Sequence, residues 1–264
     1  MPFYVVKTPN NFFEGTGFNP SRKLARTSTG VLWCCYCGPD GGGITQIYVS
    51  YSLDNGVTWT EEQVTLEVGD QESPSIAVDS LDNIHIAWRG RVIGVNNIRY
   101  RRRTAGGWDA IEEVTNMSWQ FAPSIDIDSL DNIHVVWIGK GWGVNPTKHN
   151  VQYRQKSGGV WQAQEAITDI ATSQWGDSSA IAIDINDIVC VAWVGEGWGV
   201  NVGIRNIQYR QRVAGVWQAQ ESVTDLAVTQ QMPCLAIDSS GNVHMAWYAE
   251  TGFGAVYDLF YRER

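Results

Sequence analysis

Charged side chains follow a recurring apolar run in this sequence of 264 residues, and their sign is not the same in every copy. In chain order they are Asp40, Arg91, Lys140, Glu196 and Glu250. The three acids are candidate catalytic residues, because glycoside hydrolysis needs one carboxyl group as acid and a second as base or nucleophile. The two cations are suited to bind the carboxylate of an acidic sugar. The alternative is that all five are solvated loop charges.

Aromatic residues in glycine-rich segments form a second set of candidates, for binding rather than catalysis. The phrase Gly-Trp-Gly-Val-Asn occurs at 141–145 and again at 197–201. A ring stacks on the C–H face of a sugar, and an amide can hydrogen-bond to its hydroxyl groups. The predicted ligand-binding residues are these rings and amides, further aromatic residues and the two cations: Trp119, Trp142, Asn145, Trp175, Trp198, Asn201, Phe253, Arg91 and Lys140. The alternative is that the rings pack between neighbouring repeats.

An internal repeat must position these residues. A phrase that resembles Ile-Ala-Val-Asp, followed by a polar turn and an apolar run ending in Trp, begins at Ile76, Ile125, Ile181 and Leu235. Its Asp recurs at spacings of 49, 56 and 54 residues, and the Trp follows the Asp by nine residues each time. Behind the first three of these phrases comes a Tyr-to-Trp spacing of eight with glycines between, as in Tyr153 and Trp161. Units of four short strands at this period are typical of β-propeller blades.

The repeat predicts an all-β fold, a single five-bladed β-propeller with four antiparallel strands per blade. A degenerate copy near Leu24 supplies the first blade, and the predicted blades span 21–72, 73–121, 122–176, 177–231, and 232–264 together with 1–20. The last copy stops just after Tyr261, before its fourth strand. Residues 3–8 match a fourth strand in type, so we expect this N-terminal strand to close the last blade and remove an unpaired edge. The varied second-to-third loops and the links between blades share one face, where binding is expected.

One hairpin carries a recognisable motif. Residues 52–59 read Ser-Leu-Asp-Asn-Gly-Val-Thr-Trp and match the Asp-box, Ser-x-Asp-x-Gly-x-Thr-Trp. In this respect the chain resembles the sialidase-like, Asp-box (BNR-repeat) propellers. That resemblance implies a propeller fold, and it makes Arg22 the candidate for a carboxylate-binding arginine, although Lys23-Leu24 departs from the family pattern. The nucleophile pair and the other arginines of sialidases have no counterpart by motif, and Asp-boxes lie away from the substrate face.

Composition excludes several kinds of partner. The net charge is −9, which disfavours nucleic acid. The sequence has no long apolar run, so no membrane insertion is expected, and its first residues do not read as a signal peptide. The five Cys are expected to be buried reduced thiols. No metal site or cofactor is predicted, and His85, His134 and His244 are interpreted as structural.

Two classes of function remain open. The first is a carbohydrate-binding propeller, a lectin or a recognition module of a virion or tail, because near-identical loops in several blades favour multivalent binding. The second is an enzyme, either a sialidase-like glycoside hydrolase or a polysaccharide lyase. Arg22 and the differing charges that follow the apolar runs favour this class. A protein-interaction scaffold that uses the same face is a third alternative. A glycan or polysaccharide is the expected partner in the first two.

Overall fold

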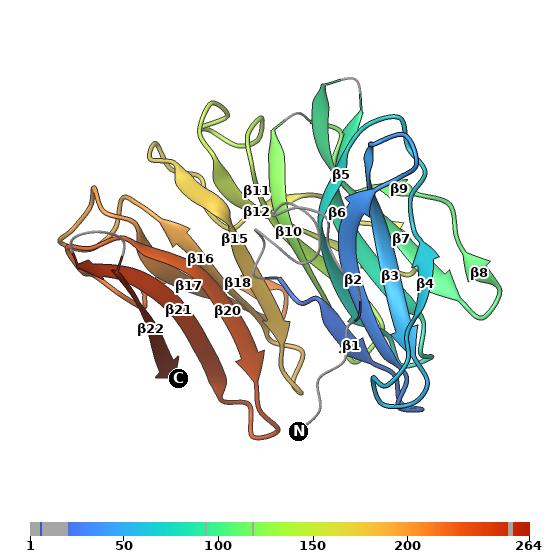
Figure 1. Ribbon diagram of the computed structural model, residues 1–264. Helices are drawn as coiled ribbons and strands as arrows, with labels where there is room; N and C mark the ends of the chain where they lie inside the picture. Colours follow the sequence, from blue (N-terminus) through green and yellow to red (C-terminus); the bar gives the residue numbers. More distant parts are fainter. Residues whose placement is uncertain (1–5, 7–20, 93, 118, 253–255) are drawn as a thin grey trace.

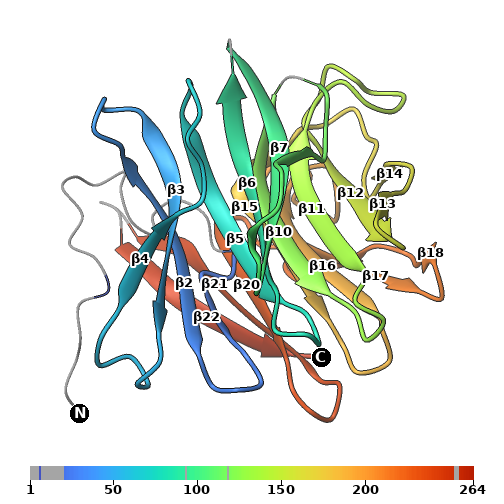
Figure 2. The same cartoon turned by 90° about the vertical axis from the view of Figure 1, so that its right-hand side faces the viewer.

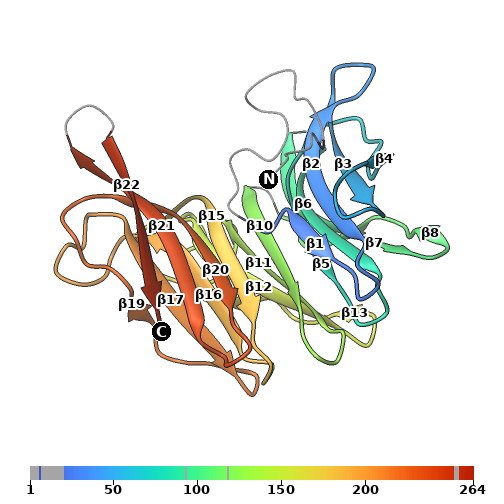
Figure 3. The same cartoon turned by 60° about the horizontal axis from the view of Figure 1, so that its bottom comes forward.

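The computed structural model describes residues 6, 21–92, 94–117, 119–252 and 256–264, and within them it has strands and turns but no helix. Five antiparallel sheets are arranged as a five-bladed β-propeller, so the predicted fold class is confirmed (Figure 1). Figure 3 shows the first strand of each sheet facing the middle of the molecule. With no helix among the described residues, none is available there to cross a membrane.

The first two blades contain the following strands. Blade 1 holds β1 (Leu24–Arg26), β2 (Leu32–Pro39), β3 (Thr45–Ser52) and β4 (Thr60–Gln63). Blade 2 holds β5 (Gln71–Val78), β6 (Ile84–Val92), β7 (Val95–Thr104), β8 (Gly107–Trp108) and β9 (Glu112–Glu113). In blade 2 the fourth strand is therefore split into two short pieces, both paired with β7.

The remaining blades repeat this plan (Figure 2). Blade 3 holds β10 (Gln120–Ile127), β11 (Ile133–Gly139), β12 (Asn150–Ser157), β13 (Val160–Trp161) and β14 (Glu165–Ala166). Blade 4 holds β15 (Gln174–Ile183), β16 (Val189–Gly195), β17 (Asn206–Val213), β18 (Val216–Trp217) and β19 (Glu221–Ser222). Blade 5 holds β20 (Gln230–Ile237), β21 (Val243–Gly252) and β22 (Val256–Glu263). The predicted blade boundaries fall inside β5, β10, β15 and β20, because each inner strand begins slightly earlier than expected.

The repeated Trp forms the centre of each blade. Trp88, Trp137 and Trp193 are fully buried, and each indole Nε1 donates to the Gln that opens the same blade's inner strand. The two partners lie 2.7, 2.6 and 3.0 Å apart in blades 2, 3 and 4. A side chain at Gly139 would overlap the amide of Gln120, which explains why glycine stands two residues after this Trp.

Neighbouring blades are joined by a repeated polar contact. In blade 4, Arg212 makes a two-point contact with Glu165 of blade 3, and Trp217 Nε1 donates to the same carboxylate at 2.7 Å. The equivalent acids Glu62 and Glu112 bind a cation and a Trp of the next blade in the same way. In blades 2 to 4, the Trp of each Tyr-to-Trp phrase therefore joins its own blade to the preceding one through a hydrogen bond to that Glu.

The two ends of the propeller differ. We call the end with the first-to-second turns and the third-to-fourth hairpins the turn face, and the opposite end the loop face. On the turn face, Ser80 donates its N–H and hydroxyl to Asp131 of the next blade at 2.8 and 2.6 Å. Ser28 with Asp82 and Ser129 with Asp187 form the same clamp.

Blade 5 differs from the others at its outer edge. Leu259 is 80% exposed and Tyr261 is 61% exposed, whereas Ile98 and Tyr100, which hold the same register positions in blade 2, are buried. The described part of blade 5 has three strands, without the fourth strand that covers β7 in blade 2. The predicted closing strand at residues 3–8 lies outside the described residues, apart from Val6.

The cysteines are free, as expected, but not all are buried. Cys35, Cys37 and Cys190 lie in the core, Cys34 is partly exposed, and Cys234 on β20 is exposed. The expectation of burial is wrong for Cys234 because blade 5 is less covered than the blades on which the pattern was read.

Candidate functional site

The inner strands present their most variable side chains at the loop face. In blades 2 to 5 each begins with the Gln that binds the core Trp, and one residue later comes a position occupied by Glu72 in blade 2 and Phe121 in blade 3. Directly afterwards the register with the second strand shifts, and Ser73 and Ala122 have φ of 54° and 50°. Such bulges re-aim the neighbouring side chains and recur beside active sites.

Trp119 directly precedes β10, the inner strand of blade 3, and it is more exposed than Trp142. Its side chain is 58% exposed, and its φ of 66° is unusual for a residue with a bulky side chain. The ammonium group of Lys140 lies over the indole, 5.4 Å from the ring centroid. Trp119 also accepts the backbone N–H of Lys140 at 3.2 Å. The ring and the cation are thus held together as one surface.

Phe121 connects this surface to two further groups. Its ring centroid lies 6.3 Å from that of Trp119 and 6.0 Å from that of His149. From blade 2, the guanidinium of Arg89 lies 5.3 Å from the Phe121 centroid, and Arg89 forms an ion pair with Glu72. We call Glu72, Arg89, Trp119, Phe121, Lys140 and His149 the blade 2–3 cluster.

His149 is held as a neutral base within this cluster. Partial burial and the positive charge of Lys140 both lower the pKa of His149 below its ordinary value of 6.5. The backbone carbonyl of His149 accepts the N–H of Gln174 at 2.7 Å, which ties the residue to blade 4. An imidazole that is unprotonated near neutral pH can accept a proton from a substrate.

The blade 2–3 cluster combines a stacking surface, two cations, a neutral imidazole and one carboxylate. That set suits an anionic sugar, since the indole can stack on the ring while Lys140 neutralises its carboxylate. Among the residues that the structure describes, no group of three or more His, Cys, Asp or Glu is placed to hold a metal ion. The side chains of the cluster themselves offer proton transfer, through His149, and charge stabilisation, through Lys140.

The structure does not bring the predicted acids together. Asp40 caps its own turn, accepting the N–H groups of Gly42 and Ile44 at 2.8 and 3.0 Å. Glu196 lies 3.7 Å from Arg205, and Glu250 is exposed on β21. No contact between any two of these acids is found in the described part of the chain. When the strand pairings of blades 1 and 2 are matched, Pro39 holds the position in blade 1 that Arg91 holds in blade 2, and Asp40 lies one residue further along.

Arg22 makes a contact across the propeller instead of joining a carboxylate-binding set. Its guanidinium binds Asp126 of blade 3 at two points, 2.8 and 3.2 Å. Asp126 also accepts the N–H of Ile183 in blade 4 at 3.0 Å. This ion pair links blades 1, 3 and 4, so Arg22 is occupied by a protein carboxylate.

The twin loops use their polar groups internally. Asn145 donates its side-chain amide to Asp169 at 3.1 Å, and Asn201 makes the same contact with Asp225 at 3.0 Å. Trp142 is 39% exposed, whereas Trp198 is half-buried and packs edge-on against Trp193 at 6.4 Å. A role in ligand binding stays a prediction for these four residues. Phe253 and the side chain of Trp175 lie outside the described part of the structure.

Of the predicted site residues, Trp119 and Lys140 belong to the blade 2–3 cluster, and Arg91 is exposed at the loop-face end of β6. Sequence analysis missed Glu72, Arg89, Phe121 and His149. The sequence does contain a signal for Glu72 and Phe121, because the residue type that follows the repeated Gln differs between blades. These residues are Glu72, Phe121, Trp175 and Gln231. His149 falls in a loop with no repeat partner, so no pattern indicated it.

The hairpin at residues 52–59, which matches the Asp-box in sequence, has well-defined local geometry. Asp54 accepts the N–H and hydroxyl of Thr58 at 2.8 and 2.6 Å, and these bonds lower the pKa of Asp54 to about 2. Gly56 has φ of 90°, and its carbonyl accepts Trp59 Nε1 at 3.0 Å. The hairpin lies on the turn face, away from the blade 2–3 cluster.

The chain was compared with family models, curated proteins and solved structures. No family model and no curated protein matches. One similar solved structure is a protein of unknown function from Dyadobacter fermentans DSM 18053, with 13% sequence identity and a TM-score of 0.68 over 94% of this chain and 78% of that chain. A second is an ulvan lyase of a new polysaccharide lyase family bound to -[GlcA(1-4)Rha3S]-, with 12% identity and a TM-score of 0.61 over 95% of this chain and 71% of that chain. A third is the Penicillium chrysogenum α-L-arabinanase complexed with arabinobiose, with 12% identity and a TM-score of 0.60 over 94% of this chain and 85% of that chain. At these identities the likeness establishes the propeller fold alone.

Proposed function

We propose that this protein is a polysaccharide lyase that cleaves an anionic, uronate-containing glycan at the blade 2–3 cluster. The observation that carries the proposal is the position of His149, kept neutral close to the cationic Lys140 and the exposed indole of Trp119. Support also comes from the similar structures, which include a lyase bound to a glucuronate-containing glycan and an arabinanase.

The proposed reaction is a β-elimination on a uronate unit. Trp119 stacks on a sugar ring, and Lys140 neutralises the uronate carboxylate, which acidifies the proton on the α-carbon. His149 accepts that proton. The electron pair of the C–H bond forms a double bond between the α- and β-carbons, the bond from the β-carbon to the glycosidic oxygen breaks, and that oxygen takes a proton from water.

Hydrolysis is less well supported by the residues present. A glycosidase needs two carboxyl groups at a defined separation across the scissile bond. Asp40 is used to cap a turn and Glu196 lies beside Arg205, while Glu72 is paired with Arg89. None of the three is positioned as a partner for another acid.

The equivalent loops of blades 3 and 4 favour a second candidate, a binding propeller without catalysis. Both loops place a Trp at the same point, above a matching Asn-to-Asp contact. If these loops form two weak glycan sites, avidity supplies the affinity. This candidate predicts binding without any change in the polysaccharide.

One assay separates the candidates. The protein is incubated with uronate polysaccharides and with neutral arabinan, and both the ultraviolet absorbance of unsaturated products and the release of reducing ends are followed. We expect absorbance and reducing ends to rise together on a uronate polymer. We also expect His149→Gln to lower kcat by about 100-fold or more, since a general base contributes 10²–10⁴. Reducing ends without absorbance would establish hydrolysis, and binding without either signal would establish the non-catalytic candidate.

A further inference from the structure

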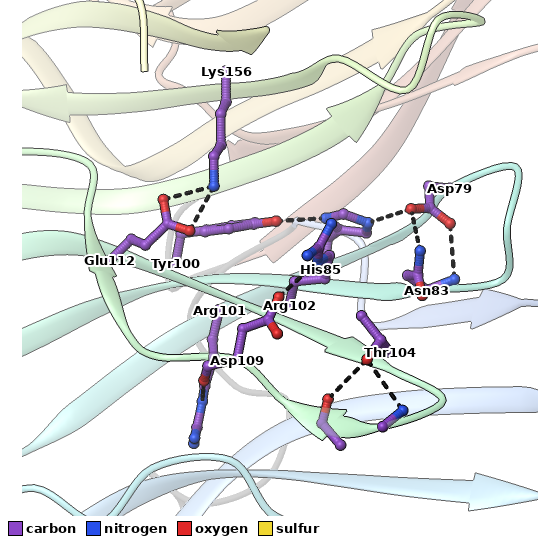
Figure 4. Close-up of polar contacts among 12 residues, drawn as sticks. Asp79, Asn83, His85, Tyr100, Arg101, Arg102, Thr104, Asp109, Glu112 and Lys156 are labelled. Carbon is purple, nitrogen blue, oxygen red and sulfur yellow. Dashed lines mark hydrogen bonds and ion pairs between the residues drawn. The ribbon is translucent and has the colours of Figure 1, made fainter. Parts of the chain in front are cut away.

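A pocket lies on the turn face, between blades 2 and 3. It is a pocket of about 350 Å³. Tyr100 and His85 of blade 2 line it, together with Arg102, Lys156, Leu130 and the Gly158–Gly159 hairpin. Figure 4 shows the polar residues from blades 2 and 3 that converge here. Because this is the turn face, the pocket lies at the opposite end of the propeller from the blade 2–3 cluster.

The floor of this turn-face pocket is a fixed part of the repeat. His85 Nδ1 lies 2.7 Å from the Tyr100 hydroxyl, and His85 Nε2 lies 3.0 Å from Asp79 Oδ2 (Figure 4). Asp79 also accepts bonds from Asn83. Blade 3 repeats the same contacts with His134, Tyr153 and Asp128. These groups are fully engaged with one another, so they shape the pocket but offer a ligand little.

One residue of the rim, Arg102, departs from the repeat. The position of Arg102 is occupied by Gln155 in blade 3, Gln211 in blade 4 and Glu263 in blade 5. The Nε of Arg102 donates a hydrogen bond to the Asp109 carboxylate at 2.7 Å, and the Arg102 side chain is 45% exposed. Its two terminal nitrogens make no hydrogen bond with any residue in the described ranges. They are therefore available to a ligand.

The opposite wall is open and partly apolar. Leu130 is 77% exposed at the mouth of the pocket. Gly158 and Gly159 both have positive φ, and a side chain added at either would meet no atom within 4 Å. The hairpin therefore leaves room for a flat ligand against its backbone.

The charge of the lining selects the class of ligand. Arg102 and Lys156 are matched by the carboxylates of Asp79 and Asp131, and both cations are further paired with Asp109 and Glu112. This surplus of carboxylates disfavours an anion, and the Arg102 guanidinium disfavours a cation. Arg102 offers hydrogen-bond donors, and Asp131 offers acceptor lone pairs beyond the two bonds that it accepts from Ser80. Together they suit hydroxyl groups, which both accept and donate hydrogen bonds.

We propose that the turn-face pocket binds an uncharged sugar ring, with its hydroxyl groups between Arg102 and Asp131 and its C–H face on Leu130. A volume of about 350 Å³ lies within the range of small-molecule sites and accommodates one or two sugar units. The proposal does not depend on the chemistry of the loop face. It adds a second point of attachment for a glycan, distinct from the site of cleavage.

Saturation-transfer NMR with methyl glycosides of neutral hexoses, pentoses and deoxyhexoses tests this proposal, with glucuronate as the charged comparison. We expect at least one neutral glycoside to bind, glucuronate to bind more weakly, and the ring signals of His85 and Tyr100 to shift on titration. Arg102→Gln, which installs the residue found in blades 3 and 4, should weaken binding at least tenfold. Gln155→Ala, at the matching position of blade 3, serves as the control and should leave binding unchanged.

The loop-face variants separate this site from the proposed lyase. Trp119→Ala and His149→Gln should abolish cleavage of the polymer while the neutral glycoside still binds with its original affinity. Failure of every neutral glycoside to bind, unchanged binding in Arg102→Gln, or loss of binding in Trp119→Ala would each overturn the turn-face site. None of these results would alter the assay for elimination.

Discussion

The turn face and the loop face of this propeller are built on different principles. On the turn face, the Ser–Asp clamps and the Asp–His–Tyr contacts recur from blade to blade with nearly the same distances. On the loop face, the residue after the repeated Gln is acidic in blade 2 and aromatic in blade 3. Repetition therefore marks architecture, whereas a departure from the repeat marks a place where a ligand can be recognised.

The joint between blades 4 and 5 shows that even the architecture is not uniform. Where blades 2 and 3 have Ser80 and Ser129, blade 4 has Ile185, and where the next blade would supply an Asp it has Gly241. Both halves of the clamp are absent at this joint. Gly241 retains the left-handed conformation, with φ of 86°, that the clamp residues Asp131 and Asp187 adopt at 59°. The backbone is thus still shaped for a contact that the side chains no longer make.

The largest expected difference is between two tryptophans. Trp193 is fully buried and bonded to Gln174, so Trp193→Ala should lower the free energy of unfolding by about 3–5 kcal/mol. Trp119 is mostly exposed, so Trp119→Ala should change it by no more than about 0.5 kcal/mol. Urea denaturation followed by circular dichroism measures both. A large loss of stability in Trp119→Ala would make that residue part of the architecture and remove it from the site.

The repeat was sufficient to predict the blades, because blades 2 to 5 each bury the same Trp and pair the same strands. The repeat alone does not tell which of its side chains a ligand would contact. Asn145 and Asn201 are predicted to bind a ligand, and the structure shows that each amide bonds an Asp in its own blade, so their role in binding stays a prediction. Phe121 on β10 and His149 before β12 come together in the folded blade 3, and no spacing in the sequence indicates that contact.

A smaller effect is expected from rebuilding the missing clamp. The double variant Ile185→Ser with Gly241→Asp should raise the free energy of unfolding by about 0.5–1.5 kcal/mol, the usual net value of a hydrogen bond. Each single variant should give little or none of this gain, so a double-mutant cycle isolates the contact. Ser80→Ala, which breaks an existing clamp, is the matched control and should shift stability in the opposite direction. An additive cycle would contradict the assignment of these positions as clamp partners.

The smallest effect concerns pH. If His149 acts as the base, kcat falls as His149 is protonated, and its lowered pKa keeps the enzyme active below the pH at which an ordinary histidine would be charged. Lys140→Gln removes one positive charge that lowers this pKa, so the pKa rises and the acid limb of the kcat profile should move to higher pH by a fraction of a unit. Arg89 on blade 2 and Glu72 stay in place in this variant. A shift to lower pH would contradict the role of His149 as the base.

The most direct test compares two double variants on the same uronate polysaccharide. Trp142→Ala with Trp198→Ala removes the repeated loop rings, and Trp119→Ala with His149→Gln removes the ring and the base that have no repeat partner. We measure the rate of unsaturated product formation at saturating substrate, with thermal unfolding as the check on folding. The account predicts that the first variant retains most of its activity and that the second is inactive although folded. Retained activity in the second variant, or its loss only in the first, would contradict the claim that the site lies where the repeat is broken.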